Sequence, residues 1–104
     1  MHAIIRRYDS IDQSRKSELF KKVEDSLLPT LRELPGFNGY SLIDAGDGVV
    51  TTVGFFDTAA QADESTRVAG RWLREQKLET ALPNPPEITT GDVLVHETAV
   101  PVQA

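Results

Sequence analysis

Two hydrophobic runs, at 37–44 and 49–56, flank an Asp-Gly pair and combine β-branched and aromatic residues with small ones. This pattern predicts a β-hairpin. Either a two-residue turn at 47–48 or a four-residue loop at 45–48 would connect the strands. The two registers differ by two residues, so both place the same side chains on the same face of the hairpin. One predicted face carries Asn38, Tyr40, Leu42, Thr51, Val53 and Phe55, and the other carries Phe37, Gly39, Ser41, Ile43, Val50, Thr52, Gly54 and Phe56.

Alternating side chains also predict a first strand at 3–8 and a last strand at 88–96. The apolar centre of the last strand is predicted at 93–95, where three aliphatic residues follow one another. A glycine and an aspartate at 91–92 predict a bulge or bend just before that centre.

Apolar residues at spacings of three and four predict a first helix over 14–34. Its N-terminal cap is either a capping box at 10–13 or a single residue, Asp12 or Ser14. Because Pro29 has no backbone N–H to donate, the helix is expected to bend or restart there.

A second helix is predicted over 58–76, after a capping box formed by Thr58 and Gln61, with Asp57 as an alternative cap. The first turns of this helix are rich in alanine and serine. Such small side chains let a helix lie close to a sheet or leave space beneath it.

The predicted order of elements is β-α-β-β-α-β, which is the ferredoxin-like arrangement of an α+β protein. It gives a four-stranded antiparallel sheet with both helices on one face. The other face would then be uncovered, although both predicted faces of the hairpin are largely apolar or small. We therefore expect a homodimer in which the sheet faces of two copies cover each other.

Composition narrows the function classes. The chain has 104 residues, which predicts a single domain over 1–104. Its net charge of -5 argues against a nucleic-acid partner, which requires a basic surface. The absence of cysteine excludes disulfides and every thiolate-based site. No apolar run is long enough for a membrane span and no signal-peptide pattern is present, so a cytoplasmic protein without a membrane partner is expected.

Two short motifs resemble a known family. The sequence Leu34-Pro35-Gly36-Phe37 opens the second strand, and Phe56-Asp57-Thr58 leads into the alanine-rich helix. Together with the order and length of the elements, they resemble the dimeric α+β barrel superfamily, and within it the antibiotic-biosynthesis-monooxygenase-like domains. The resemblance covers nearly the whole chain and implies a barrel formed by two subunits. It also implies two chemistries, cofactor-free oxygenation of aromatic polyphenols and haem degradation.

The haem-degrading branch uses an asparagine on the first strand, and a tryptophan and a haem-ligating histidine on the second helix. Aligned on the two motifs, this chain has Arg7, Ser65 and Glu75 near those positions. Because none of them matches, haem degradation is not expected. His2 and His96 lie near strand ends without a second ligand at a suitable spacing, so neither is expected to bind haem or a metal ion. No cofactor is expected.

Four residues are candidates for ligand binding: Arg7, Asn38, Tyr40 and Trp72. If the protein is an oxygenase, a phenolate substrate would lie between helices and sheet, with Arg7 stabilising its charge. Asn38 or Tyr40 would then stabilise negative charge that develops on oxygen. Packing in the core is the alternative role for Tyr40 and Trp72. Solvent exposure is the alternative for the neighbouring arginines at 6–7, which alternate between the two faces of the strand.

Two functions follow from these observations. The first is a cofactor-independent, monooxygenase-like enzyme that acts on a small apolar or aromatic molecule, with its catalytic residues not assigned. The second is a non-catalytic small-molecule-binding or assembly module with the same dimeric barrel fold. A pocket of about a few hundred cubic ångströms would favour the enzyme, and a filled interior would favour the module.

Overall fold

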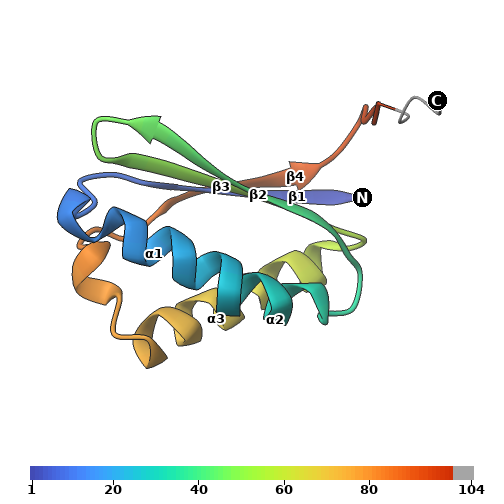
Figure 1. Cartoon of the computed structure of the whole chain (residues 1–104). Coiled ribbons are helices and arrows are strands. Elements are labelled where there is room, and N and C mark those ends of the chain that lie inside the picture. Colours follow the sequence, from blue (N-terminus) through green and yellow to red (C-terminus); the bar gives the residue numbers. More distant parts are fainter. Residues whose placement is uncertain (100–104) are drawn as a thin grey trace, which may run out of the picture.

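The computed structural model describes residues 1–99, which form two layers, a sheet and a set of helices on one of its faces (Figure 1). The strands are β1 (His2–Tyr8), β2 (Phe37–Gly46), β3 (Val49–Phe56) and β4 (Glu87–Asp92). They are arranged in the order β2-β3-β1-β4, and each neighbouring pair is antiparallel. This is the predicted ferredoxin-like α+β fold.

The first helical region contains four segments in succession: η1 (Gln13–Arg15), α1 (Lys16–Lys22), η2 (Val23–Leu27) and α2 (Leu28–Arg32). Of the caps that the sequence left open, Asp12 is the one used. Its carboxylate accepts a hydrogen bond of 3.0 Å from the backbone N–H of Ser14.

The predicted restart at Pro29 is confirmed. The segment η2 is a π-helical turn, in which the N–H of Leu28 donates to the carbonyl of Val23, and α2 begins directly after it. A wider turn at this point accommodates proline, which lacks the N–H that a regular helix uses.

The second helical region is α3 (Ala59–Glu75), followed by the short η3 (Glu79–Ala81). The predicted capping box of α3 is present. The Thr58 hydroxyl accepts from the N–H of Gln61 at 3.2 Å, and the Gln61 side chain accepts from the N–H of Thr58 at 3.1 Å. Lys77, with a φ of +57°, turns the chain out of the helix, and Leu78 is then completely buried.

The hairpin register differs from both predicted registers. A two-residue turn does join Gly46 to its partner Val49, but Ala45 has no partner and shifts the register beyond it by one residue. A shift of one residue transfers a strand's side chains to the opposite face. The predicted faces are therefore wrong for most of β2. Tyr40 pairs with Gly54 and Leu42 with Thr52, whereas Ser41 pairs with Val53 and Ile43 with Thr51.

The last strand is shorter than predicted. It ends at Asp92, which pairs with His2 near the start of β1, and its register is continuous without the expected bulge. The N–H of Val93 still donates to the carbonyl of Met1 at 2.9 Å, one residue beyond the last pair of β1 and β4. The predicted apolar centre is therefore not in the sheet, and Leu94 and Val95 are 92% and 88% exposed. Figure 1 shows this segment leaving the body of the protein.

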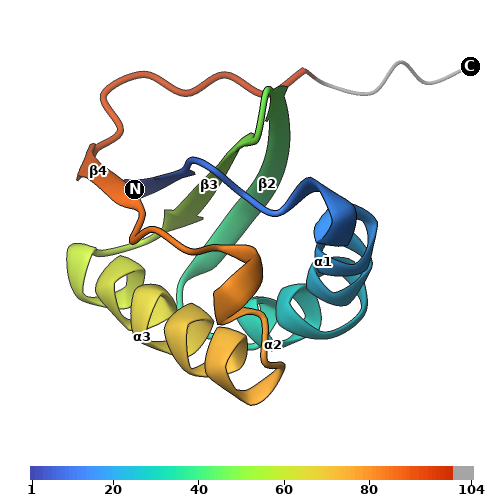
Figure 2. The same ribbon diagram turned by 90° about the vertical axis from the view of Figure 1, so that its left-hand side faces the viewer.

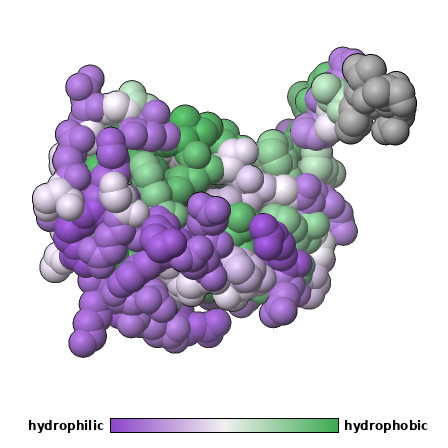
Figure 3. Space-filling view, in the orientation of Figure 1, coloured by the Kyte–Doolittle hydropathy of each residue, from purple (hydrophilic) through white to green (hydrophobic). Residues whose placement is uncertain are grey.

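The two faces of the sheet have different surroundings. The helix-facing side chains of β1 and β3, such as Ile4, Val50 and Phe56, are buried. On the opposite face, apolar side chains remain partly or fully exposed. Figure 3 shows apolar residues along the sheet side of the molecule, whereas the helix side is mainly hydrophilic. The apolar members of this open face are Ala3, Ile5, Ile43, Val53 and Phe55.

The capping box gives a test of how α3 is held at its start. Thr58→Ala should lower the free energy of unfolding by about 1 kcal/mol, because the N–H of Gln61 loses its acceptor. Thr58→Ser keeps a hydroxyl and is the matched control. Chemical denaturation measures both, and equal stability of the two variants would contradict a role for the cap.

Candidate functional site

A buried arginine lies at the centre of the layer between sheet and helices. Arg6 belongs to β1, an inner strand, and its side chain faces the helices with only 2% of its surface exposed. Its Nε donates to the hydroxyl of Thr52 on β3 at 3.4 Å, and its Nη1 donates to the hydroxyl of Thr66 on α3 at 3.1 Å. One guanidinium thus connects three elements of the fold.

Arg6 has no anionic partner among residues 1–99, because no carboxylate of this part of the chain lies within 4.0 Å of it. Its Nη2 forms no hydrogen bond with these residues either. Every fully buried side-chain nitrogen and oxygen in the described region does have a partner. The free Nη2 therefore borders an open space instead of being sealed in the core.

That space begins as a small cavity of about 30 Å³ between the sheet and the helices. A cavity of this size has room for about one water molecule and not for an aromatic ring. Its polar lining consists of Arg6, Tyr8, Tyr40, Thr52 and Trp72, and its apolar lining of Leu19, Val23, Leu27, Leu42, Val50, Ala69, Leu73 and Leu82.

A groove of about 520 Å³ adjoins this cavity, and residues that include Arg6, Tyr8 and Leu82 line both spaces. The groove lies between α3 and the connection to β4, which contributes three prolines at 83–86. Figure 2 shows this connection crossing the end of the molecule between the helix layer and the sheet. The volume of the groove is in the range of small-molecule sites.

Two tyrosines share the cavity with Arg6. Burial raises the pKa of Tyr8 and the pKa of Tyr40 above the ordinary value of 10.0, and the positive charge of Arg6 partly opposes both shifts. Both hydroxyls are therefore protonated at neutral pH and available as hydrogen-bond donors.

The structure brings together two of the four predicted site residues. Tyr40 and Trp72 line the cavity beside Arg6, and the indole Nε1 of Trp72 donates to the hydroxyl of Ser26 at 2.9 Å. Tyr40 faces the helices because of the register shift at Ala45.

The other two predicted residues lie elsewhere. Arg7 is on the open face of the sheet, where its side chain is half-exposed and 3.8 Å from the carboxylate of Asp9. Asn38 is exposed at a second irregularity of β2, and its amide donates to the carboxylate of Asp57 at 2.8 Å. Neither side chain lines the cavity or the groove.

Sequence reasoning missed Arg6, Tyr8, Thr52 and Thr66 as members of one cluster. A signal for Arg6 was present, because it alternates with Ile4 and Tyr8 on the apolar face of its strand. An arginine at an apolar position of an inner strand is rarely buried without a reason.

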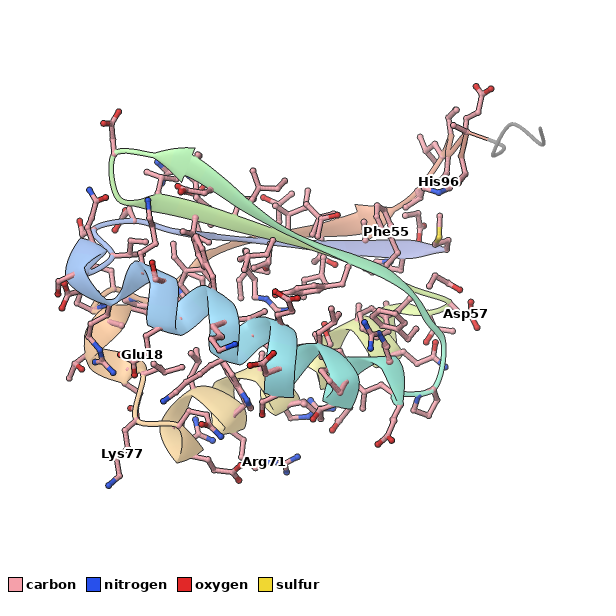
Figure 4. The ribbon with its side chains drawn as sticks, in the orientation of Figure 1. Glu18, Phe55, Asp57, Arg71, Lys77 and His96 are labelled. Carbon is pink, nitrogen blue, oxygen red and sulfur yellow. The ribbon has the colours of Figure 1, made fainter. Side chains whose placement is uncertain are left out.

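The histidines are held by polar neighbours. The ring of His2 is hydrogen-bonded to Thr90 at 2.6 Å and lies 3.2 Å from the carboxylate of Asp92. His96 contacts the Thr98 hydroxyl and lies over Phe55 on the open face, with ring centroids 5.3 Å apart (Figure 4). Within residues 1–99, no group of three or more potential metal ligands is found, and no helix is long and apolar enough to cross a membrane.

Comparison with known proteins relates the chain to others through structure. No known family and no curated protein matches its sequence. A protein of unknown function from Nitrosomonas europaea, NE2512, has a TM-score of 0.75 at 17% identity, over 96% of this chain and 95% of that one. A monooxygenase from the gene ActVA-Orf6 of Streptomyces coelicolor, in complex with nanaomycin D, has a TM-score of 0.65 at 15% identity, over 97% of this chain and 92% of that one. MhuD, with two manganese protoporphyrin IX bound per active site, has a TM-score of 0.73 at 14% identity, over 95% of this chain and 100% of that one.

These likenesses establish the fold. The chain has the fold of these solved structures, which include proteins described as antibiotic biosynthesis monooxygenases, and it is 17% identical to them or less. Structures with this architecture include monooxygenases and proteins of unknown function, so the chemistry depends on the side chains of each site.

Titration of the tyrosines tests the described environment. Tyr8 and Tyr40 are the only two tyrosines of the chain, so ultraviolet absorbance of phenolate reports on both. In the folded protein both should ionise above pH 10.0, and in denaturant near the ordinary value. Since folding raises these pKa values, the associated stability is present below pH 10 and is lost as the pH rises through the folded values.

Removing the charge of Arg6 should move the folded titration further upward, because that charge lowers both tyrosine pKa values. The matched control is Arg71→Gln, which changes an exposed arginine that Figure 4 shows pointing away from the sheet. Identical titration curves for Arg6→Gln and Arg71→Gln would contradict the placement of Arg6 beside the tyrosines.

Proposed function

We propose that the protein is a cofactor-independent, monooxygenase-like enzyme that acts on a small aromatic molecule. The substrate would bind in the groove beside α3, with its reacting end at Arg6. The observation that carries this proposal is the buried, unpaired guanidinium at the junction of cavity and groove. The fold that the chain shares with a monooxygenase in complex with nanaomycin D supports the same class of chemistry.

The side chains at the junction suit a reaction that passes through an oxyanion. In oxygenation of a phenol to a quinone, one atom of O2 enters the ring and the other leaves as water with two hydrogens of the substrate. No external reductant is needed for this step. Arg6 would stabilise negative charge on the substrate oxygen, and the hydroxyls of Tyr8 and Tyr40 would donate hydrogen bonds to it.

A non-catalytic binding module is the second candidate. It is favoured by one specific observation, the cavity of only about 30 Å³ between sheet and helices. A substrate ring would therefore have to remain largely in the groove or displace side chains to reach Tyr40 and Trp72. In a binding module, the same groove would hold a ligand without chemical change.

We further infer that the protein acts as a homodimer joined through the open faces of two sheets. The apolar residues of that face, Ile5, Ile43, Val53 and Phe55, lie opposite the helices, and no helix or strand of residues 1–99 covers them, although the ring of His96 lies over Phe55. A two-fold axis allows one such face to cover an identical one. The proposed ligand site lies on the other side of the sheet, so it would not be blocked by dimer formation.

Oxygen consumption tests the enzymatic proposal. Wild-type protein given a panel of hydroquinones and phenols should take up O2, monitored with an oxygen electrode and by mass spectrometry of the product. Arg6→Gln should lower kcat/KM by about a hundredfold or more, by analogy with the loss of one oxyanion donor. Arg71→Gln should leave it unchanged. Uptake that is absent for the whole panel, or equal in both variants, would favour the binding module.

Light scattering tests the dimer. At micromolar concentration, the wild type should have about twice the chain mass of 11.5 kDa. Val53→Lys should give monomer or unfolded protein, because it places a charge at the centre of the open face. Ser17→Lys on the exposed surface of α1 is the control and should remain dimeric. A monomeric wild type at all concentrations would contradict the dimer.

A further inference from the structure

We propose that the ligand of this site is a carboxylate on an apolar or aromatic body, and that the guanidinium of Arg6 is its counter-ion. The inference rests on the site of the proposed function, but not on the oxygen chemistry. In a substrate that is also a phenol, the carboxylate would pair with the two terminal nitrogens of Arg6, and the phenol oxygen beside it would accept hydrogen bonds from Tyr8 and Tyr40. It assigns the chemical class of the ligand and the residue that selects it.

The positive charge of Arg6 is buried without a balancing anion among residues 1–99. A cation removed from water is costly unless an anion or several hydrogen bonds compensate it. Arg6 is 98% buried, has two hydrogen bonds to threonine hydroxyls, and has no carboxylate within 4.0 Å among residues 1–99. The structure thus holds a positive charge at the groove floor without supplying its partner.

The donors of Arg6 that remain free have the geometry that a carboxylate requires. A guanidinium has five N–H donors, of which Thr52 and Thr66 occupy one on Nε and one on Nη1. One donor on Nη1 and both donors on Nη2 remain. The pair of terminal nitrogens forms a fork that matches the two oxygens of a carboxylate. The threonines therefore fix the guanidinium while leaving this fork available.

The charge at the floor of the groove suits an anion with a single negative charge. A single guanidinium with neutral tyrosine hydroxyls nearby balances a monoanion. A phosphate dianion would require a second cation, and the groove offers only Arg74 at its rim, where Glu79 lies as well. Arg74 and Glu79 are exposed and their opposite charges offset each other. Arg6 is therefore the cation of the groove lining whose charge is left unbalanced.

An anion would reach Arg6 through the groove beside α3. A second groove of about 430 Å³ reaches Tyr40 from the β2 side, and its lining includes Glu24 and Asp44. Asp44 is paired with Lys16 at 3.1 Å, but Glu24 would repel an anion and no cation of residues 1–99 lines this second groove, whereas the groove beside α3 leads to Arg6. The walls of the latter groove include Leu73, Leu82 and Ile88 together with three prolines. Proline has little conformational freedom to lose, so this wall can bind an apolar body without much ordering.

The test compares two ligands of the same shape, naphthalene-2-carboxylate and naphthalene-2-carboxamide, by isothermal titration calorimetry at pH 7 with full-length protein. The acid should bind about tenfold more tightly than the amide or better, because it makes a charge-assisted pair with Arg6. Arg6→Gln should reduce this ratio to about twofold or less, and Arg6→Lys should leave it between these values, since lysine keeps the charge but not the fork. The exposed Arg71→Gln variant should keep the wild-type ratio.

Equal affinity of acid and amide for the wild type, or no binding of either probe, would overturn the carboxylate assignment. Because this comparison uses the wild type alone, it decides the question even if the Arg6 variants fail to fold. A persistent preference for the acid in a folded Arg6→Gln would assign the selectivity to another group and also overturn the inference. A different result would contradict the proposed function: tight binding of the acid together with no uptake of O2 in the presence of any phenol of the panel.

Discussion

A positive charge buried between the sheet and the helices is the constraint on which the rest of the site depends. Arg6 donates one hydrogen bond to a hydroxyl of β3 and one to a hydroxyl of α3, so both bonds require a fixed position of α3 relative to the sheet. Ala69 and Gly70 of α3 line the groove, and the single methyl group of Ala69 and the lack of a side chain at Gly70 leave its floor open. The two tyrosines beside Arg6 supply neutral donors and not a counter-charge.

Around Arg6, packed side chains fill the region between the helices, whereas the region between α3 and the connection to β4 is open as a groove. Leu19, Leu27, Leu31 and Trp72 pack the helices against each other and form the main core. On the β4 side, the connection between α3 and β4 contributes prolines to the wall of the groove. Because proline does not continue a regular helix, no helix covers the groove at this connection. A groove with a charged floor and a rigid apolar wall is the outcome, and it is separate from the apolar open face of the sheet.

Much of the fold could be predicted from the sequence, because hydrophobic periodicity and cap residues are local signals. The capping box at Thr58 and the helix restart at Pro29 are examples, and both are present. The faces of β2 could not be predicted, because a single unpaired residue, Ala45, changes them and leaves no distinct sequence signal. The end of β4 depends on where β1 begins, which is a property of the partner strand and not of the apolar run at 93–95.

The same reasoning explains why the candidate residues predicted from the sequence include Tyr40 and Trp72 but not Arg6. Tyr40 and Trp72 are large residues at interior positions, so they were identified as candidates, and they do line the cavity. The choice between Arg6 and Arg7 required knowledge of which face the helices cover. Alternation along the strand shows only that the two arginines point in opposite directions.

The central claim is that Arg6 is kept for a ligand at a cost to the stability of the free protein. Its most direct test is the free energy of unfolding of Arg6→Met without ligand, measured by chemical denaturation. A buried charge without an anionic partner should be replaceable by an apolar side chain of similar length, so the variant is expected to be as stable as the wild type or more stable. A loss of about 3 kcal/mol or more, the size expected on breaking a buried ion pair, would show that Arg6 is a structural residue and would contradict the account.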